Sequence, residues 1–207
     1  MQKTDGSVIG LFFEVKPKPG HLDNYFTYVE KLKSELSKQK GLLWLQRYHA
    51  LLDNNSLLSH QLWDHQDSIV TWRQNKAHRS AQTAGIKTHF QDYRIRIGER
   101  LRHGSIDELD LKKKVSSLNG KLLLSIHSNV FLPKAAFDDC GLIPSVFSAV
   151  INPHNIITLN TIEDMEQAVF LAKTLDKSVI DKAELFLINR DYSMFDRDQA
   201  PRHDSPE

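Results

Sequence analysis

The sequence predicts an α+β fold made of two β-α-β-β-α-β halves in one chain, and three observations predict it. Short apolar runs rich in β-branched and aromatic residues alternate with segments of helical periodicity, in the same order twice. A turn separates the second and third strands of each half, at residues 53–55 and at residues 152–155. Trp72 and Phe170 lie near the same point of their helices, which indicates a degenerate internal repeat.

The first half, residues 1–101, has the order of a ferredoxin-like split βαβ unit. Its first strand is an apolar run that the segment KPKPG at 16–20 ends. Apolar residues spaced three and four apart mark the first helix, which Gly41 ends. Asp67 or Ser68 can cap the next helical stretch, and Gly85 breaks it. The expected strands are residues 8–15, 42–52, 57–63 and 90–101, and the expected helices lie at 21–39 and 67–85.

The second half, residues 120–192, repeats this order in a shorter form. Residues 102–119 are polar and charged and are expected to be a linker, and residues 193–207 are expected to be a disordered tail. Pro133 predicts a short and irregular first helix. The expected strands are residues 121–130, 144–151, 156–161 and 183–189, and the expected helices lie at 131–141 and 163–175.

The apolar strands require cover on both faces of each sheet. Both helices of a ferredoxin-like half lie on one face, so the other face would expose runs such as VIGLFF at 8–13. Two such sheets can pack face to face and complete a barrel within the single chain. Whether the protein also forms a homodimer is left open by the sequence.

Composition excludes several classes of protein. The formal net charge is +1 without a basic stripe, which argues against nucleic-acid binding, and the basic run Lys112 to Lys114 lies in the expected linker. The single Cys140 rules out an internal disulfide and fits a reducing compartment. No signal peptide and no apolar run of membrane-spanning length is visible. We therefore expect a soluble cytoplasmic protein without a membrane partner.

Residues 62–82 are the most informative stretch for function. They bring Trp63, Trp72, His78 and Gln82 into one strand-to-helix unit. Two indoles, an imidazole and an amide suit a pocket that stacks a flat organic ligand and hydrogen-bonds its edge. The alternative is a core helix with two aromatic anchors.

Residues 7–101 resemble the antibiotic biosynthesis monooxygenase (ABM) domains of the dimeric α/β-barrel superfamily. The resemblance rests on the segments FFEVKPKPGHLDNYF at 12–26, LWDHQDSIVTWR at 62–73, HRSAQTAG at 78–85 and FQDYRIRIGE at 90–99. The second half resembles a divergent domain of the same superfamily through INPHNIITLNTIEDMEQAVFLAKTL at 151–175. The resemblance implies that two such halves pack sheet to sheet as an intramolecular dimeric α/β-barrel.

The family implies two chemistries. One is cofactor-independent oxygenation of aromatic or quinone-type molecules, and the other is haem binding and degradation. The haem-degrading branch uses an asparagine, a tryptophan and a histidine, whose positions fall here at Phe13, Trp72 and Gln82. Only the tryptophan matches, so we expect no cofactor, with haem binding as an alternative that would recruit His78. The spacing of the histidines at 49, 60 and 65 is not that of a metal pair, so no metal site is expected.

Oxygenation without a cofactor assigns a role to each candidate residue. Trp72 would stack the substrate, Gln82 would donate to its oxygen, and His78 would act as the base. Either Arg47 or Tyr48 would add a donor from the sheet, because neighbouring strand residues point to opposite faces. Phe13 and Trp63 are also expected to contact the substrate. The alternatives are that His78 only binds backbone, that Gln82 is surface, and that the protein is a ligand-binding or structural member without turnover.

Overall fold

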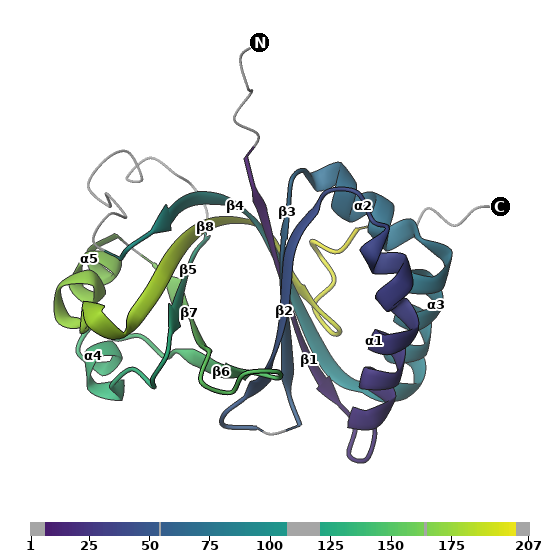
Figure 1. Ribbon diagram of the computed structural model, residues 1–207, viewed down its shortest axis with the longest axis horizontal. Helices are drawn as coiled ribbons and strands as arrows, with labels where there is room; N and C mark the ends of the chain where they lie inside the picture. The colour runs from purple at the N-terminus through teal and green to yellow at the C-terminus, as the bar shows by residue number, and fades with distance from the viewer. Residues whose placement is uncertain (1–6, 54, 107–120, 164, 202–207) are drawn as a thin grey trace, which may run out of the picture.

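The computed structural model describes residues 7–53, 55–106, 121–163 and 165–201, and its strands form a closed antiparallel barrel with helices outside it (Figure 1). The strands are β1 (Ile9–Pro17), β2 (Leu42–Ala50), β3 (Leu57–Trp63), β4 (Phe90–Gly104), β5 (Lys121–Ser128), β6 (Ser145–Ala149), β7 (Ile156–Ile162) and β8 (Ile180–Ser193). The α-helices are α1 (Leu22–Ser37), α2 (Gln66–Gln74), α3 (Lys76–Ala84), α4 (Lys134–Asp138) and α5 (Met165–Thr174). Short helical turns lie at Gly85–His89 and Lys177–Val179.

The barrel consists of two sheets, one from each half of the chain. The strand order is β4-β1-β3-β2 in the first half and β8-β5-β7-β6 in the second, so equivalent strands occupy equivalent places. The sheets join where β2 pairs with β6 and where the two longest strands, β4 and β8, pair along most of their length. Helices α1 to α3 cover the first sheet from outside and α4 and α5 cover the second (Figure 1). The prediction of two ferredoxin-like halves that close one barrel is confirmed.

Side chains alternate between the barrel interior and the helix layers, as the two-residue period of a strand requires. On β1, Phe12 points inward and lies in a T-shaped contact with Phe186 of β8, whereas Phe13 points towards the helices. Arg94 and Arg96, which share one face of β4, form ion pairs with Asp191 and Glu14 respectively. The buried interior also includes Tyr48, Leu58, Leu62, Leu123, Phe147, Ala149, Ile157 and Leu159.

The helical region of residues 67–85 differs from the expectation of one stretch broken at Gly85. It starts earlier, because the His65 side chain accepts a hydrogen bond from the Asp67 amide and caps α2. Asn75 then adopts an extended ψ of 129° and its side chain accepts from the His78 amide, which ends α2 and caps α3. Beyond Gly85 the chain continues through a π-helical turn before β4.

The segments expected to be linker and tail are partly structured. β4 continues to Gly104 because it pairs with β8 as far as Ala183, Ile106 is buried in the core of the second half, and residues 107–119 lie outside the described residues. β8 extends to Ser193, and residues 194–201 return along the first half, where the Met194 amide donates to the Tyr93 carbonyl at 3.0 Å. The expectation of disorder is therefore wrong for 193–201, and 202–207 lie outside the described residues.

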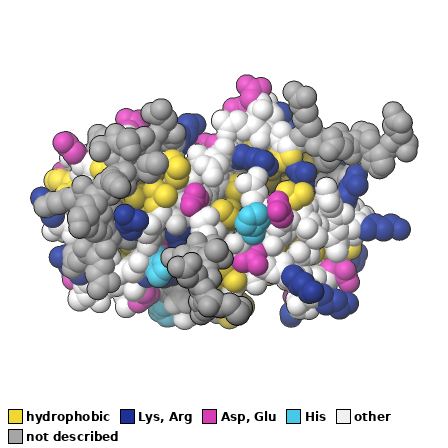
Figure 2. All heavy atoms as spheres, turned by 90° about the horizontal axis from the view of Figure 1, so that it is seen from above, with side chains coloured by type: hydrophobic (Ala, Val, Ile, Leu, Met, Phe, Trp, Pro, Cys, Tyr) yellow, Lys and Arg dark blue, Asp and Glu magenta, His cyan; other side chains and the backbone are white. Residues whose placement is uncertain are grey.

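The visible surface carries charges of both signs. In the view of Figure 2, lysine and arginine side chains are interspersed with acidic ones on the described part of the face. This mixture matches the formal net charge of +1. None of the described helices combines the length and the apolarity that crossing a bilayer requires.

The contact between the two sheets is testable at Gly10 on β1. A Cβ atom there would overlap the ring of Phe186, which is fully buried and has no room to move. We expect Gly10→Ala to lower the free energy of unfolding by about 1–3 kcal/mol through overpacking, although alanine is otherwise preferred over glycine within a strand. Denaturant unfolding measures the loss. Combining Gly10→Ala with Phe186→Leu should cost less than the sum of the two single changes, and strict additivity would contradict the contact.

Candidate functional site

The helix layer of the first half is not closed to solvent. Tyr25 is the only buried residue of the 16 in α1, and none of the nine described residues of α3 is buried. On the sheet beneath them, Leu11 and Phe13 of β1 and Ile95 of β4 keep partial exposure although helices cover them. An amphipathic helix packed tightly on a sheet would bury its apolar stripe. These side chains therefore leave part of the layer between α1, α3 and the first sheet accessible to solvent, and we call this layer the helix-side cleft.

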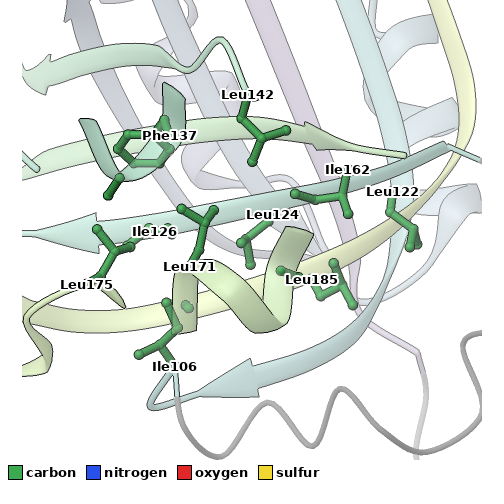
Figure 3. Close-up of a cluster of buried hydrophobic side chains, with 13 residues drawn as sticks. Ile106, Leu122, Leu124, Ile126, Phe137, Leu142, Ile162, Leu171, Leu175 and Leu185 are labelled. Atoms are coloured by element: carbon green, nitrogen blue, oxygen red, sulfur yellow. The ribbon is translucent and has the colours of Figure 1, made fainter. Parts of the chain in front are cut away.

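The equivalent layer of the second half is solid by comparison. Side chains from β5, β8, α4 and α5 form one cluster of buried residues with the labelled side chains pointing towards one another (Figure 3). Leu124, Leu171 and Leu185 at its centre are all 0% exposed. The second half thus has one large buried cluster in its helix layer, whereas the first half has two smaller clusters, around Trp72 and Tyr25, with partly exposed side chains beside them.

Trp72 and His78 lie together at one side of the helix-side cleft. Trp72 is buried among Ile9, Trp63, Ile69 and Ile97. The imidazole of His78 stacks on its indole, with ring centroids 4.3 Å apart and an angle of 16° between the planes. One face of the Trp72 ring is therefore covered by the imidazole of His78.

The backbone fixes the tautomer of His78. Its Nδ1 lies 2.9 Å from the carbonyl oxygen of Trp72. A carbonyl only accepts hydrogen bonds, so Nδ1 carries the proton and Nε2 keeps its lone pair. Burial lowers the pKa of His78, although the bond to Trp72 acts in the opposite direction. At pH 7 the neutral imidazole is thus hydrogen-bonded to the backbone through Nδ1, as the alternative interpretation of His78 expected. Its Nε2 can still accept a proton.

Arg47, and not Tyr48, points towards the helices. The guanidinium of Arg47 hydrogen-bonds the phenol of Tyr25 on α1, and the pKa of Tyr25 is raised by burial with Arg47 opposing the rise. The Nε of Arg47 is buried without a hydrogen-bond partner among the described residues. Tyr48 lies on the opposite face of β2, inside the barrel, so of the two alternatives Arg47 is the one that faces the helices.

The remaining predicted residues divide between the cleft and the core. Phe13 is partly exposed and lies 6.1 Å from the ring of Phe90, and Gln82 on α3 is also partly exposed. Trp63 is 0% exposed, and its indole N–H donates to Gln61 Oε1 at 3.0 Å. It has no surface to offer a ligand, so the expectation that Trp63 contacts substrate is corrected to a core role.

The structure also brings together polar residues that sequence reasoning did not single out. Trp44, His60, His127 and Glu184 come from four different strands and meet inside the barrel near its opening. Their positions are up to 140 residues apart in the chain, so no local motif links them. The only signal in the sequence was a histidine or an acid at a position where strand alternation predicts an inward apolar residue.

A hollow of about 410 Å³ lies where β8 meets residues 196–199. Its charged groups already satisfy one another, since Asp191 pairs with Arg94 at 2.7 Å and with Lys121 at 3.4 Å. The pairing holds the pKa of Asp191 below its usual range. This hollow is therefore explained as a surface ion-pair network.

The cleft residues do not fit haem iron. The position that would supply the histidine ligand is Gln82, and an amide is not among the usual axial ligands of haem. His78, the substitute, is stacked on Trp72 and tied to its carbonyl. Among the described residues, no group of three or more His, Cys, Asp or Glu side chains is arranged to hold a metal ion.

Comparisons with known proteins match either the first half or nearly the whole chain. A family model described as antibiotic biosynthesis monooxygenase matches residues 8–84, from the start of β1 to the end of α3. A jasmonate monooxygenase ABM of Pyricularia oryzae is 25% identical over 223 residues, covering 96% of this chain and 99% of the relative. The structure of PA3566 from Pseudomonas aeruginosa is 14% identical over 46% of this chain and 96% of its own, with a TM-score of 0.42.

The structure of an anthrone oxidase-like protein is 10% identical and covers 98% of this chain and 99% of its own, with a TM-score of 0.41. The family match contains most of the walls of the helix-side cleft, namely β1, β2, α1 and α3. Within this chain, residues 8–84 therefore match the antibiotic biosynthesis monooxygenase (ABM) family model.

Proposed function

We propose that this protein is a monooxygenase that works without flavin or metal on a flat aromatic or quinone-type molecule in the helix-side cleft. The main support for this proposal is the partial exposure of side chains in the helix layer of the first half, within the residues that match the family model. The helix layer of the second half, by contrast, contains one large buried cluster. The partly exposed side chains around the space include Phe13, Arg47, His78 and Gln82. They combine an aromatic wall with a cation, a base and an amide donor.

The proposed reaction draws all its electrons from the substrate. A base removes a proton from an activated CH₂ group or from the phenol conjugated with it, and the resulting anion gives one electron to O₂. The two radicals combine to a peroxide, which loses water and leaves a carbonyl group. One oxygen atom of O₂ enters the product and the other leaves as water, so that the conversion of CH₂ to C=O balances the reduction of O₂.

The protein's part is to take the proton and to stabilise the anion. His78 can act as the base because its pKa is lowered by burial and its Nε2 lone pair is not needed by the backbone. Arg47 and Gln82, on opposite walls of the cleft, can hold the anionic oxygen with a charge and an amide donor. Exclusion of bulk water by α1 and α3 would strengthen both interactions.

The name of the Pyricularia oryzae relative suggests a second candidate substrate. Its name assigns it jasmonate, and the similarity extends over nearly the whole of both chains. Jasmonate therefore belongs beside anthrones and hydroquinones in any substrate panel. Binding of such molecules without turnover would favour the alternative of a ligand-binding member of the family.

The role of Gln82 as an oxyanion donor can be tested by substitution. With the metal-free and flavin-free protein and an anthrone substrate, we expect O₂ uptake and one ¹⁸O atom from ¹⁸O₂ in the product. Gln82→Leu should lower kcat/KM by about 10²-fold, the scale expected for loss of one oxyanion donor. Oxygen-electrode rates and mass spectrometry provide the measurement.

The matched control for this change is Arg79→Leu, which alters an exposed residue on the same helix. It should leave kcat/KM within about twofold, since neither variant loses helix propensity. Equal rates for Gln82→Leu and the wild-type protein would remove Gln82 from the site. Failure of the entire panel, jasmonate included, to consume O₂ would overturn the proposed function.

The second prediction concerns pH. The pKa of His78 lies below the usual value of about 6.5, so the imidazole is a neutral base at pH 7 and becomes protonated only in more acidic solution. For a substrate that does not titrate there, kcat/KM should be level around pH 7 and should fall as pH drops through the lowered pKa of His78. His78→Gln should reduce the plateau and abolish this acidic limb. An unchanged acidic limb in His78→Gln would assign the base to another group.

A further inference from the structure

A second hollow, of about 270 Å³, opens at one end of the barrel on the inner side of the sheets. We call it the barrel-mouth site. Its walls come from both halves of the chain. The lining residues are Trp44, Gln46 and Tyr48 of β2, His127 and Ser128 of β5, Asn155 and Ile156 at the start of β7, and Asp181 and Lys182 of β8. The first sheet separates it from the helix-side cleft, since Tyr48 and Arg47 point to opposite faces of β2.

Buried polar groups without partners gather at the barrel-mouth site. The phenol oxygen of Tyr48 is buried and has no hydrogen-bond partner among the described residues, although Tyr48 is only 1% exposed. Directly behind lies His60, which is 0% exposed and has neither ring nitrogen bonded. His127 Nε2 lies 3.4 Å from Glu184 Oε2 but outside hydrogen-bond geometry. Because an unpaired buried polar group is costly, such a concentration points to a ligand.

Each of these groups can donate a hydrogen bond, and the nearby carboxylate of Glu184 is already engaged. Glu184 Oε1 accepts from Arg100 at 2.9 Å and Oε2 accepts from Lys182 at 3.1 Å. This leaves further N–H groups on the Lys182 ammonium, together with the Tyr48 hydroxyl and one N–H on each imidazole. The other acid at the site, Asp181, is exposed and therefore screened by water. The spare donors suit an anionic oxygen.

The remaining walls of the barrel-mouth site are formed by aromatic rings. The Trp44 ring meets the rings of His60 at 5.1 Å and of His127 at 6.2 Å, both edge to face, and Lys182 Nζ lies 5.1 Å from the centre of the indole. Phe12 stacks on the far side of His60 at 4.2 Å and fixes that ring. The volume equals that of about nine water molecules at ~30 Å³ each. A single small ring with one polar group fits this space.

From this we infer that the barrel-mouth site binds a small aromatic carboxylate, with the ring against Trp44 and the carboxylate towards Tyr48, His127 and Lys182. The inference does not depend on the proposed oxygenase activity, because it concerns the other face of the sheet. It assigns a binding role to the interior of the barrel, where both halves of the chain contribute.

Benzoate, with benzamide as the neutral isostere, tests the inference on the full chain. Calorimetry should give a Kd for benzoate at or below about 1 mM, and benzamide should bind at least about tenfold more weakly. Tyr48→Phe and Lys182→Met should each weaken benzoate about five- to tenfold, while Lys173→Met, an exposed lysine of α5, should have no effect. Thermal unfolding of each variant checks that the fold is kept.

Two further variants locate the bound probe. Trp44→Phe should abolish the fluorescence change that benzoate causes, whereas Gln82→Leu, in the helix-side cleft, should leave both the change and the Kd as they are. The inference is overturned if benzoate does not bind, if benzamide binds equally well, or if Tyr48→Phe and Lys182→Met bind benzoate like the wild type. Loss of binding in Gln82→Leu would likewise overturn it and would assign the carboxylate to the helix-side cleft.

Discussion

Each sheet of this chain has large apolar side chains on its inner face, which it cannot leave in contact with water. The sheets resolve this by packing Phe12 of one against Phe186 of the other and by pairing their edges, β2 with β6 and β4 with β8. Closure removes every open strand edge from the described part of the barrel. The helices are thereby confined to the outside, and each sheet presents one face to a helix layer and one to the interior.

The two helix layers use the same topology differently. In the second half the leucine-rich cluster is closed around α5, and this half contributes packing to the barrel. In the first half α1 stands over side chains that remain partly exposed, so stability there depends on the smaller clusters around Trp72 and Tyr25. The two halves share one closed barrel. The well-packed second half can therefore help to stabilise the first half, whose helix layer is packed less tightly.

Much of the fold follows from the sequence because periodicity and turn residues are local properties. The strand order and the closure of the barrel could be predicted from the runs around Phe12 and the matching turns. The end of β4 and the packing of Met194 could not, since both depend on pairing with distant partners. In the site, strand alternation showed that Arg47 and Tyr48 face opposite ways but not which faced the helices. The burial of Trp63 and the stacking of His78 on Trp72 depend on tertiary packing that spacing does not encode.

The segment after β8 links the end of the described chain to its beginning. Met194 and Ala200 pack against the cluster that contains Val15 and Tyr93, and Arg197 contacts the phenol of Tyr93. The first half therefore acquires part of its packing from residues that follow the second half in the chain. Its inner sheet face and this outer cluster both stay incomplete until those later residues have been synthesised. Completion of the helix-side cleft thus depends on residues far along the chain, although its helices and most of its strands lie in the first half.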